Sequence, residues 1–177
     1  MLQVVDKSRL ISHSFELTSH TRHVVRRFSD MAFCFSRRLT KDKDSIIYEV
    51  FENQMQDLSC AFTRIFPGKI GGEFFMTKGH FHTDEDASEI YHFLSGRGLV
   101  LIQKDNKCKA LEVEEGQTLY IPPLWAHRAI NIGNKIFSFL AIYRSNAGHD
   151  FDISKKGFLQ IVVSEKGKYC LKDNEGY

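Results

Sequence analysis

From residue 46 onward, the sequence alternates between short apolar segments and turns. Glycine, proline, asparagine and aspartate stand in the breaks, as in Pro67-Gly68 and Gly71-Gly72. Regular short strands separated by such turns are typical of a β-sandwich or barrel, and not of a fold in which strands alternate with helices. The sequence therefore predicts an all-β fold, with strands at residues 46–51, 61–66, 73–77, 88–94, 98–103, 109–113, 118–122, 128–132, 137–143 and 158–163.

The two ends of the chain follow a different pattern. Residues 1–30 are mixed and polar, so we expect an arm or edge strand that packs on the domain or on a neighbouring subunit. Ser29-Asp30 offers an N-cap for a short helix over residues 31–39. At 177 residues the chain is predicted to form one domain, with the arm and helix at 1–45, a β-barrel core at 46–165 and a C-terminal tail at 166–177.

Composition and charge narrow the class of protein. A net charge of +2 and the absence of a basic stripe with interleaved aromatics argue against a nucleic-acid partner. The densest basic cluster, Arg22 to Arg27, is interpreted as a solvated face. The four cysteines are scattered without a C-x-x-C pair, which favours reduced thiols. With no signal peptide or membrane-length apolar run, we expect a soluble cytoplasmic protein.

Residues 79–98 contain a candidate metal site. His80 and His82 are two residues apart, so an extended strand would project both from one face. The polar stretch 84–87 is short enough to turn Glu89 back beside them, and His127 lies in another strand-like segment. Three imidazoles and a carboxylate suit a divalent transition metal and leave coordination positions open. The alternative is structural, because histidine pairs of this kind also occur by chance.

The other histidines are not expected to join this group. His92 has the opposite strand parity to Glu89 and should face the other way. His13, His20 and His23 lie in the N-terminal region, where a surface role is the better interpretation.

Two spaced patterns resemble the cupin motifs: H-x-H-x6-E-x6-G at 80–96 and G-x5-P-x4-H-x3-N at 116–131. The chain departs from them in a longer gap before Glu89 and in Leu124, where a glycine is usual. The resemblance implies a double-stranded β-helix, the small jelly-roll barrel, with a metal inside its mouth held by His80, His82, Glu89 and His127. The metal would be one divalent ion per subunit, Fe²⁺ first and Mn²⁺, Zn²⁺, Ni²⁺ or Co²⁺ as alternatives.

Longer stretches are similar to one cupin subfamily, the metal-dependent phosphoglucose isomerases: PGKIGGEFFMTKGHFH (67–82), SEIYHFLSGRGLVLIQ (88–103), YIPPLWAHRAINIG (120–133) and FLAIYRSNAGHDF (139–151). That family interconverts glucose 6-phosphate and fructose 6-phosphate. The resemblance implies a homodimer that binds a sugar phosphate. Its phosphate pocket would be formed by Thr63, Thr77, Gly79, Tyr91 and Tyr48, with Tyr143 and His149 close to the sugar. Hydroxyl groups and a glycine N–H are suitable phosphate donors.

The same residues have structural interpretations. Threonine is common in strands, and tyrosine is common at the rim of β cores. Strand alternation puts Thr77 and Gly79 on the opposite face from His80 and His82, so a bend or bulge near Gly79 is required. Phe151 stands where the family often has tyrosine, which would remove one hydrogen bond to the sugar.

The expected reaction is an aldose-ketose isomerisation in which a metal Lewis acid binds the C1 and C2 oxygens. Glu89 is the predicted base that moves the proton through a cis-enediol, and His149 would assist ring opening. A hydride shift would use the same residues. Two other functions fit the cupin motifs: an iron-dependent dioxygenase and a module that binds sugar phosphate without turnover.

Overall fold

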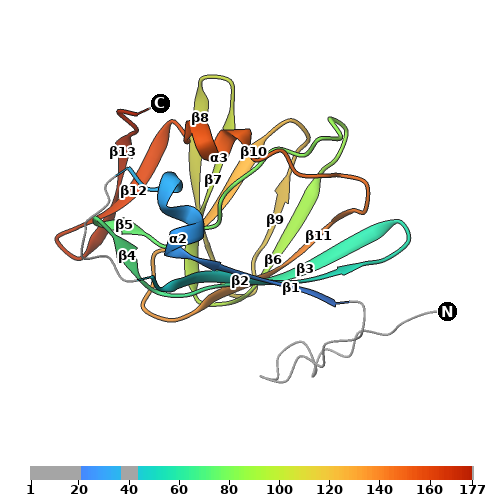
Figure 1. Ribbon diagram of the computed structural model, residues 1–177, viewed down its shortest axis with the longest axis horizontal. Helices are drawn as coiled ribbons and strands as arrows, with labels where there is room; N and C mark the ends of the chain where they lie inside the picture. Colours follow the sequence, from blue (N-terminus) through green and yellow to red (C-terminus); the bar gives the residue numbers. More distant parts are fainter. Residues whose placement is uncertain (1–20, 37–43, 177) are drawn as a thin grey trace.

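The computed structural model describes residues 21–36 and 44–176 (Figure 1). This part of the chain is mainly β-structure, with two short α-helices, α2 (Phe28–Met31) and α3 (Asp152–Lys156), and the 3-10 helix η1 (Ala32–Cys34). The strands are β1 (Thr21–Arg27), β2 (Ile46–Gln54), β3 (Leu58–Ile65), β4 (Lys69–Ile70), β5 (Glu73–Phe74), β6 (Glu89–Ser95), β7 (Arg97–Lys104), β8 (Lys107–Glu114), β9 (Thr118–Ile121), β10 (Ala126–Asn131), β11 (Phe137–Arg144), β12 (Gln160–Glu165) and β13 (Lys168–Asp173).

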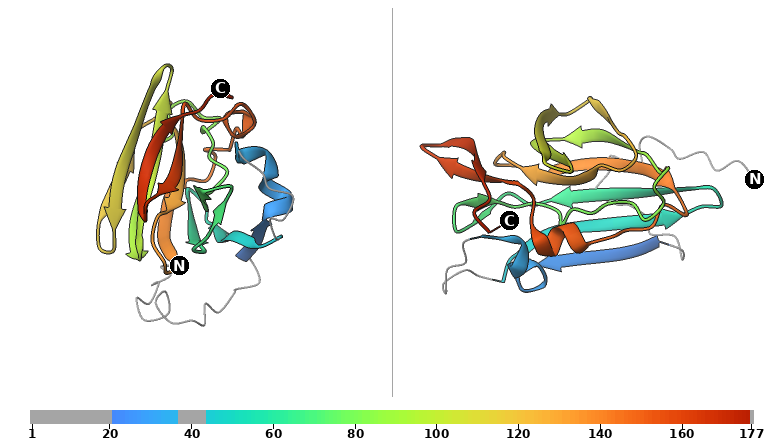
Figure 2. Two further views of the ribbon diagram at one scale, coloured as in Figure 1. Left: turned by 90° about the vertical axis from the view of Figure 1, so that its left-hand side faces the viewer. Right: turned by 90° about the horizontal axis from the view of Figure 1, so that it is seen from above.

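The strands form three antiparallel sheets around one core. The largest has the order β1-β2-β3-β11-β6-β9, and the others have the orders β10-β7-β8 and β13-β12-β5-β4. Both figures show β7 and β8 on one side of the molecule and β1 and β2 on the other (Figures 1 and 2). Strand orders that bring distant segments together, such as β3 beside β11, are typical of a jelly roll.

The core follows from the alternation in the strands. In β3 every second residue is buried, as a sheet with one apolar face requires. Three phenylalanines from neighbouring strands, Phe93, Phe137 and Phe139, are fully buried, and the rings of Phe93 and Phe137 stack with centroids 5.5 Å apart. Gly98 leaves room for this cluster, because a Cβ there would lie 2.2 Å from the Phe137 ring.

The N-terminal region contains the predicted edge strand but a different helix. Residues 21–27 form β1 at the edge of the large sheet, paired with β2, while residues 1–20 lie outside the described part. The predicted helix over 31–39 is wrong in position, since α2 begins at Phe28 and η1 ends at Cys34. Asp30 lies in the first turn, where its Oδ2 accepts a hydrogen bond from the Arg27 N–H at 2.9 Å, so it is not the N-cap. Phe35 then turns into the core in an extended conformation.

The other differences between the predicted and the observed elements concern short segments. The predicted strand at 73–77 is shortened to β5, beyond which Met76 makes an isolated bridge to Ile130. The expected C-terminal tail contains β13, which pairs with β12 along its whole length. Neither β4 nor α3 was predicted, because two-residue strands and single helical turns have almost no sequence pattern.

Candidate metal and substrate site

Three elements carry the four predicted metal ligands. His80 and His82 lie in the irregular segment after β5, Glu89 begins β6, and His127 is the second residue of β10. The backbones of His80 and His127 pair directly: each N–H donates to the other residue's carbonyl, at 3.2 and 3.0 Å. This pairing brings residues 47 positions apart in sequence (127 − 80) into register, so both imidazoles reach the same point.

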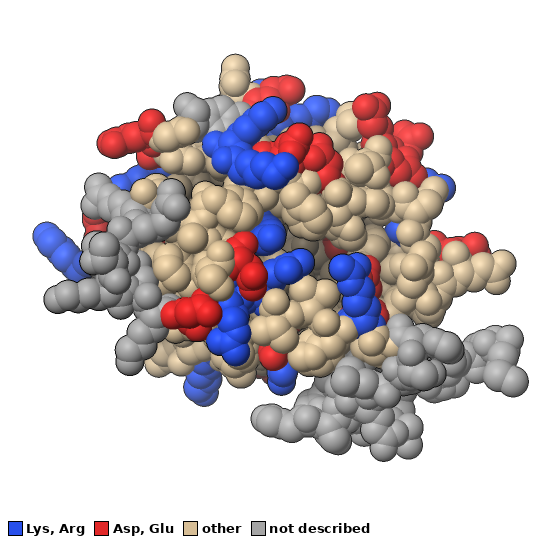
Figure 3. All heavy atoms as spheres, in the orientation of Figure 1, with Lys and Arg blue, Asp and Glu red and all other residues tan. Residues whose placement is uncertain are grey.

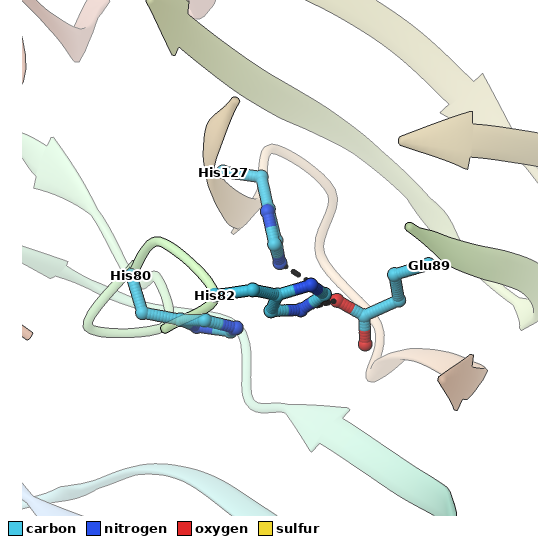
Figure 4. A group of neighbouring side chains, drawn as sticks. All are labelled: His80, His82, Glu89 and His127. Carbon is cyan, nitrogen blue, oxygen red and sulfur yellow. Dashed lines mark hydrogen bonds and ion pairs between the residues drawn. The ribbon is translucent and has the colours of Figure 1, made fainter. Parts of the chain in front are cut away.

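The four side chains converge on one centre (Figure 4). One ligand atom from each of His80, His82, Glu89 and His127 lies within 4.8 Å of all the others. The Nε2 atoms of His80 and His127 are buried and have no hydrogen-bond partner, although His127 Nε2 lies 2.7 Å from Glu89 Oε2. Buried nitrogen atoms are rarely left unsatisfied, so a cation bound between them would complete the site. The residues present therefore fit a transition metal.

Carbonyl groups behind the ring of ligands orient two of the imidazoles. Nδ1–H of His82 donates to the Ala87 carbonyl, and Nδ1–H of His127 donates to the Trp125 carbonyl, each at 3.2 Å. A histidine that donates from Nδ1 presents the Nε2 lone pair to a metal. Both rings are thus held in the tautomer that metal binding requires.

The charge states also suit a cation. Burial alone would raise the pKa of Glu89, but His127 and His82 lower it to about 2, so this carboxylate is ionised at neutral pH. Burial, reinforced by the neighbouring His127, lowers the pKa of His80 well below its usual value and keeps this ring neutral. At His82, burial opposes protonation, but the Glu89 carboxylate at 3.3 Å raises the pKa. A metal would therefore compete with a proton at His82.

A pocket of about 190 Å³ opens beside these ligands. His80 and Glu89 form part of its wall, and all of the sequence-predicted substrate residues line it as well: Tyr48, Thr63, Thr77, Gly79, Tyr91, Tyr143 and His149. The residues come from β2, β3, β6, β11 and two connecting segments. The structure therefore brings every predicted substrate residue to the cavity that the metal ligands border.

Gly79 provides the bend that the sequence requires. Its φ of +77° is a left-handed conformation, and a Cβ at this position would lie 2.6 Å from the Phe158 ring. Strand alternation is interrupted here, so Thr77, Gly79 and His80 all line one pocket. The Thr77 hydroxyl accepts a hydrogen bond from the Ala129 N–H at 3.1 Å, which leaves its own proton free to donate.

The tyrosines of the pocket remain protonated. Burial raises the pKa of Tyr48 to about 12, and burial next to Glu89 raises the pKa of Tyr91. Burial and a hydrogen bond to Glu52 raise the pKa of Tyr143. Two of these hydroxyls can donate to a ligand, whereas Tyr143 already donates to the Glu52 carboxylate.

The basic cluster on β1 is partly a solvated face, as the sequence predicted, since the Arg22 side chain is 72% exposed. Arg22, Val24 and Arg26 alternate along the strand and line the pocket, so Arg22 and Arg26 are not merely a solvated face. Lys78 lines the same pocket, where burial and then the charge of Arg26 lower its pKa. The i, i+2, i+4 spacing of these three β1 residues was the available signal. Glu52 is a further pocket residue that sequence reasoning missed.

Phe151 and His149 lie at the pocket on the segment after β11. Their rings stack with centroids 5.8 Å apart and an interplanar angle of 10°, and His149 also meets the His80 ring at 4.4 Å. Burial lowers the pKa of His149, so its imidazole is neutral at pH 7. Phe151 lines the pocket and is 42% exposed.

Comparison with known proteins identifies the family of this chain. The sequence matches the family model described as "Glucose-6-phosphate isomerase (GPI)" over residues 24–177. The chain belongs to the glucose-6-phosphate isomerase family. It is 43% identical over 169 residues to the glucose-6-phosphate isomerase of Thermococcus litoralis, with 89% of each chain covered. To the enzyme of Pyrococcus furiosus it is 44% identical over 161 residues, with 85% of each covered.

A more distant family member and a solved structure complete the comparison. The putative glucose-6-phosphate isomerase 1 of Rhizobium meliloti is 34% identical over 155 residues, covering 81% of this chain and 72% of its own. A structure of oxalate oxidase superposes with a TM-score of 0.50 at 24% identity, covering 68% of this chain and 64% of its own. This likeness concerns the fold alone and confirms the predicted all-β cupin barrel.

His92 and His23 lie outside the cluster, as the sequence predicted. His92 points away from Glu89, and its Nδ1 is 2.9 Å from the Thr118 hydroxyl. His23 stacks on Phe51 at 4.2 Å, while His13 and His20 lie outside the described residues.

Acidic and basic side chains are intermixed on the face seen in Figure 3. Within residues 21–36 and 44–176, no helix is long and apolar enough to cross a membrane.

Proposed function

We propose that this chain interconverts glucose 6-phosphate and fructose 6-phosphate, using one divalent metal held by His80, His82, Glu89 and His127. One observation carries the proposal: the four-ligand cluster and a pocket lined with phosphate-type donors share a wall in a chain of this family. A site for oxygen chemistry alone would not need such donors.

The substrate phosphate is proposed to bind at the end of the pocket formed by Tyr48, Thr63, Thr77, Gly79 and Tyr91. Arg26 and Lys78 support this assignment, because their charges favour a dianion and both line the same cavity. The hydroxyl of Thr77 and the N–H of Gly79 would donate to phosphate oxygens. The phosphate would thus fix the sugar with its reacting carbons toward the cluster.

The sugar is proposed to lie between His149, Tyr143 and Glu89. A bound metal, Fe²⁺ in our proposal, would act as a Lewis acid for the negative charge that develops on the C1 and C2 oxygens. Glu89 is ionised and buried, so its carboxylate would take the proton from C2 of the open-chain aldose and return it to C1 through a cis-enediol. The neutral His149 would move a proton during ring opening.

We further propose a cytoplasmic homodimer. Ile90 and Tyr120 pair across β6 and β9 on the outer face of the large sheet, where they are 41% and 58% exposed. Neighbouring apolar side chains of this kind are typical of a subunit interface. All four cysteines are free thiols, as expected in a reducing compartment. Light scattering should give twice the chain mass of 20.5 kDa, and Tyr120→Arg should lower it to the monomer mass.

The deciding experiment is a coupled assay for conversion of fructose 6-phosphate to glucose 6-phosphate. Chelator-treated protein should be inactive, and added Fe²⁺, Mn²⁺, Zn²⁺, Ni²⁺ or Co²⁺ should restore turnover in proportion to the metal bound. Oxygen consumption by the iron form would instead favour a dioxygenase. Tight binding of sugar phosphate without turnover in any metal would favour a binding module.

A further inference from the structure

Arg128 contacts the pocket wall from behind. It follows His127 in β10, so the two side chains project from opposite faces of the strand. Its Nε and Nη2 both donate to the backbone carbonyl of Lys78, at 3.2 and 2.6 Å. The guanidinium thus fixes the direction in which the Lys78 carbonyl points.

The direction of this carbonyl determines the direction of the next N–H. The structure contains no cis peptide bonds among the described residues, and in a trans peptide the C=O and N–H point in opposite directions. With the Lys78 carbonyl directed outward to Arg128, the Gly79 N–H is directed inward to the pocket that Gly79 lines. In the described part of the chain, no backbone hydrogen bond uses this N–H.

The surroundings of Arg128 indicate a dedicated contact. The side chain is 3% exposed, and its guanidinium lies 4.6 Å from the centre of the Phe158 ring. Within residues 21–36 and 44–176 it forms no ion pair with a carboxylate. Burial of a cation is costly, and the charge of Glu73 offsets only part of this cost, so the two hydrogen bonds from Arg128 to one carbonyl are a specific feature of this site. A cation on a carbonyl also polarises the peptide and strengthens its N–H as a donor.

We propose that Arg128 is a positioning residue for the phosphate end of the pocket. It orients and polarises the Lys78-Gly79 peptide, so that the Gly79 N–H donates to a phosphate oxygen. Phe158 supports it by stacking on the guanidinium and by excluding any side chain at position 79. This inference rests on the proposed function for the identity of the ligand, and its test does not require turnover.

The test uses the full chain loaded with Zn²⁺ and labelled with ¹⁵N-glycine, with inorganic phosphate as the probe. Among the signals of the twelve glycines, the Gly79 amide should show a large shift on adding phosphate. Arg128→Met should weaken phosphate binding about tenfold and raise the KM for fructose 6-phosphate by a similar factor, with kcat changed less than about twofold. Arg128→Lys keeps one donor and should recover part of the loss.

Lys155→Met is the matched control. Lys155 and Arg128 line the same second cavity, but Lys155 forms its ion pair with Asp152. Its substitution therefore removes a nearby positive charge and leaves the Lys78-Gly79 peptide unchanged. It should leave phosphate binding and KM unchanged. A Gly79 signal that does not move, or an Arg128→Met variant with wild-type KM and reduced kcat, would overturn the proposal. If Arg128→Met does not fold, the proposal is tested by the KM of Arg128→Lys and by the phosphate titration of the wild-type protein.

Discussion

Glu89→Gln will lower kcat by about 10² to 10⁴-fold, the range associated with the loss of a general base. Glutamine keeps the shape of the side chain and one oxygen for the metal, but it cannot accept the proton from the substrate. The wild-type carboxylate is 3% exposed and has a pKa of about 2, so a fully charged group is being replaced in a dry site. Initial rates and metal content should be measured on the same samples, at saturating metal.

Glu85→Gln provides the control, because Glu85 lies four residues earlier (89 − 85), in the turn before β6, and is exposed. Its kcat and metal content should equal those of the wild type. A Glu89→Gln enzyme that binds metal fully and retains more than about a tenth of the activity would remove Glu89 from the role of base. Isotope transfer then separates the two chemical routes. Solvent deuterium should enter the product at carbon, whereas complete retention of deuterium from C2 would support a hydride shift.

The second large effect is expected for His127→Ala, which should lose the metal and lower activity by about 10³-fold. The imidazole is 1% exposed and lies 2.7 Å from the Glu89 carboxylate, so its removal leaves a cavity and takes away the nearer of the two histidines that contact this buried charge, with His82 remaining at 3.3 Å. Metal analysis after gel filtration should find a substoichiometric ion. The melting temperature should fall as well, since a buried side chain is truncated.

His92→Ala is the appropriate comparison for this variant. His92 is also a strand histidine, but it faces the Thr118 hydroxyl on the other side of β6. Metal content and kcat should be unchanged. Normal activity with full metal occupancy in His127→Ala would show that three ligands suffice and that His127 is structural.

Much of this fold could be predicted from the sequence, for identifiable reasons. Turn residues interrupt apolar segments at regular intervals, and each such break is a local signal that needs no tertiary contact. The four candidate metal ligands could be identified from the sequence for the same reason. His80 and His82 form a local pair, and Glu89 and His127 each stand in a recognisable pattern of their own.

The pocket was harder to predict because it depends on pairings between distant segments. The alternation of Arg22, Val24 and Arg26 indicated that they share a face, but only the pairing of β1 with β2 determines that this face borders the cavity. Glu52 is similar, since its contact with Tyr143 spans 91 residues. Strand alternation was enough to predict a bend at Gly79. The side chains that surround this glycine, Phe158 and Arg128, come from later parts of the chain and could not be predicted from the local sequence.

The reciprocal backbone bonds between His80 and His127 have a consequence for how the proposed metal ion would be bound. Two of the four candidate ligands are fixed to each other by backbone hydrogen bonds, so much of the ordering cost of metal binding would be met during folding. A site assembled in advance from three imidazoles and one carboxylate holds any borderline divalent ion with little discrimination by shape. The working ion in a living cell would then reflect which free metal is most abundant there, and growth medium would alter the catalytic properties of the purified protein.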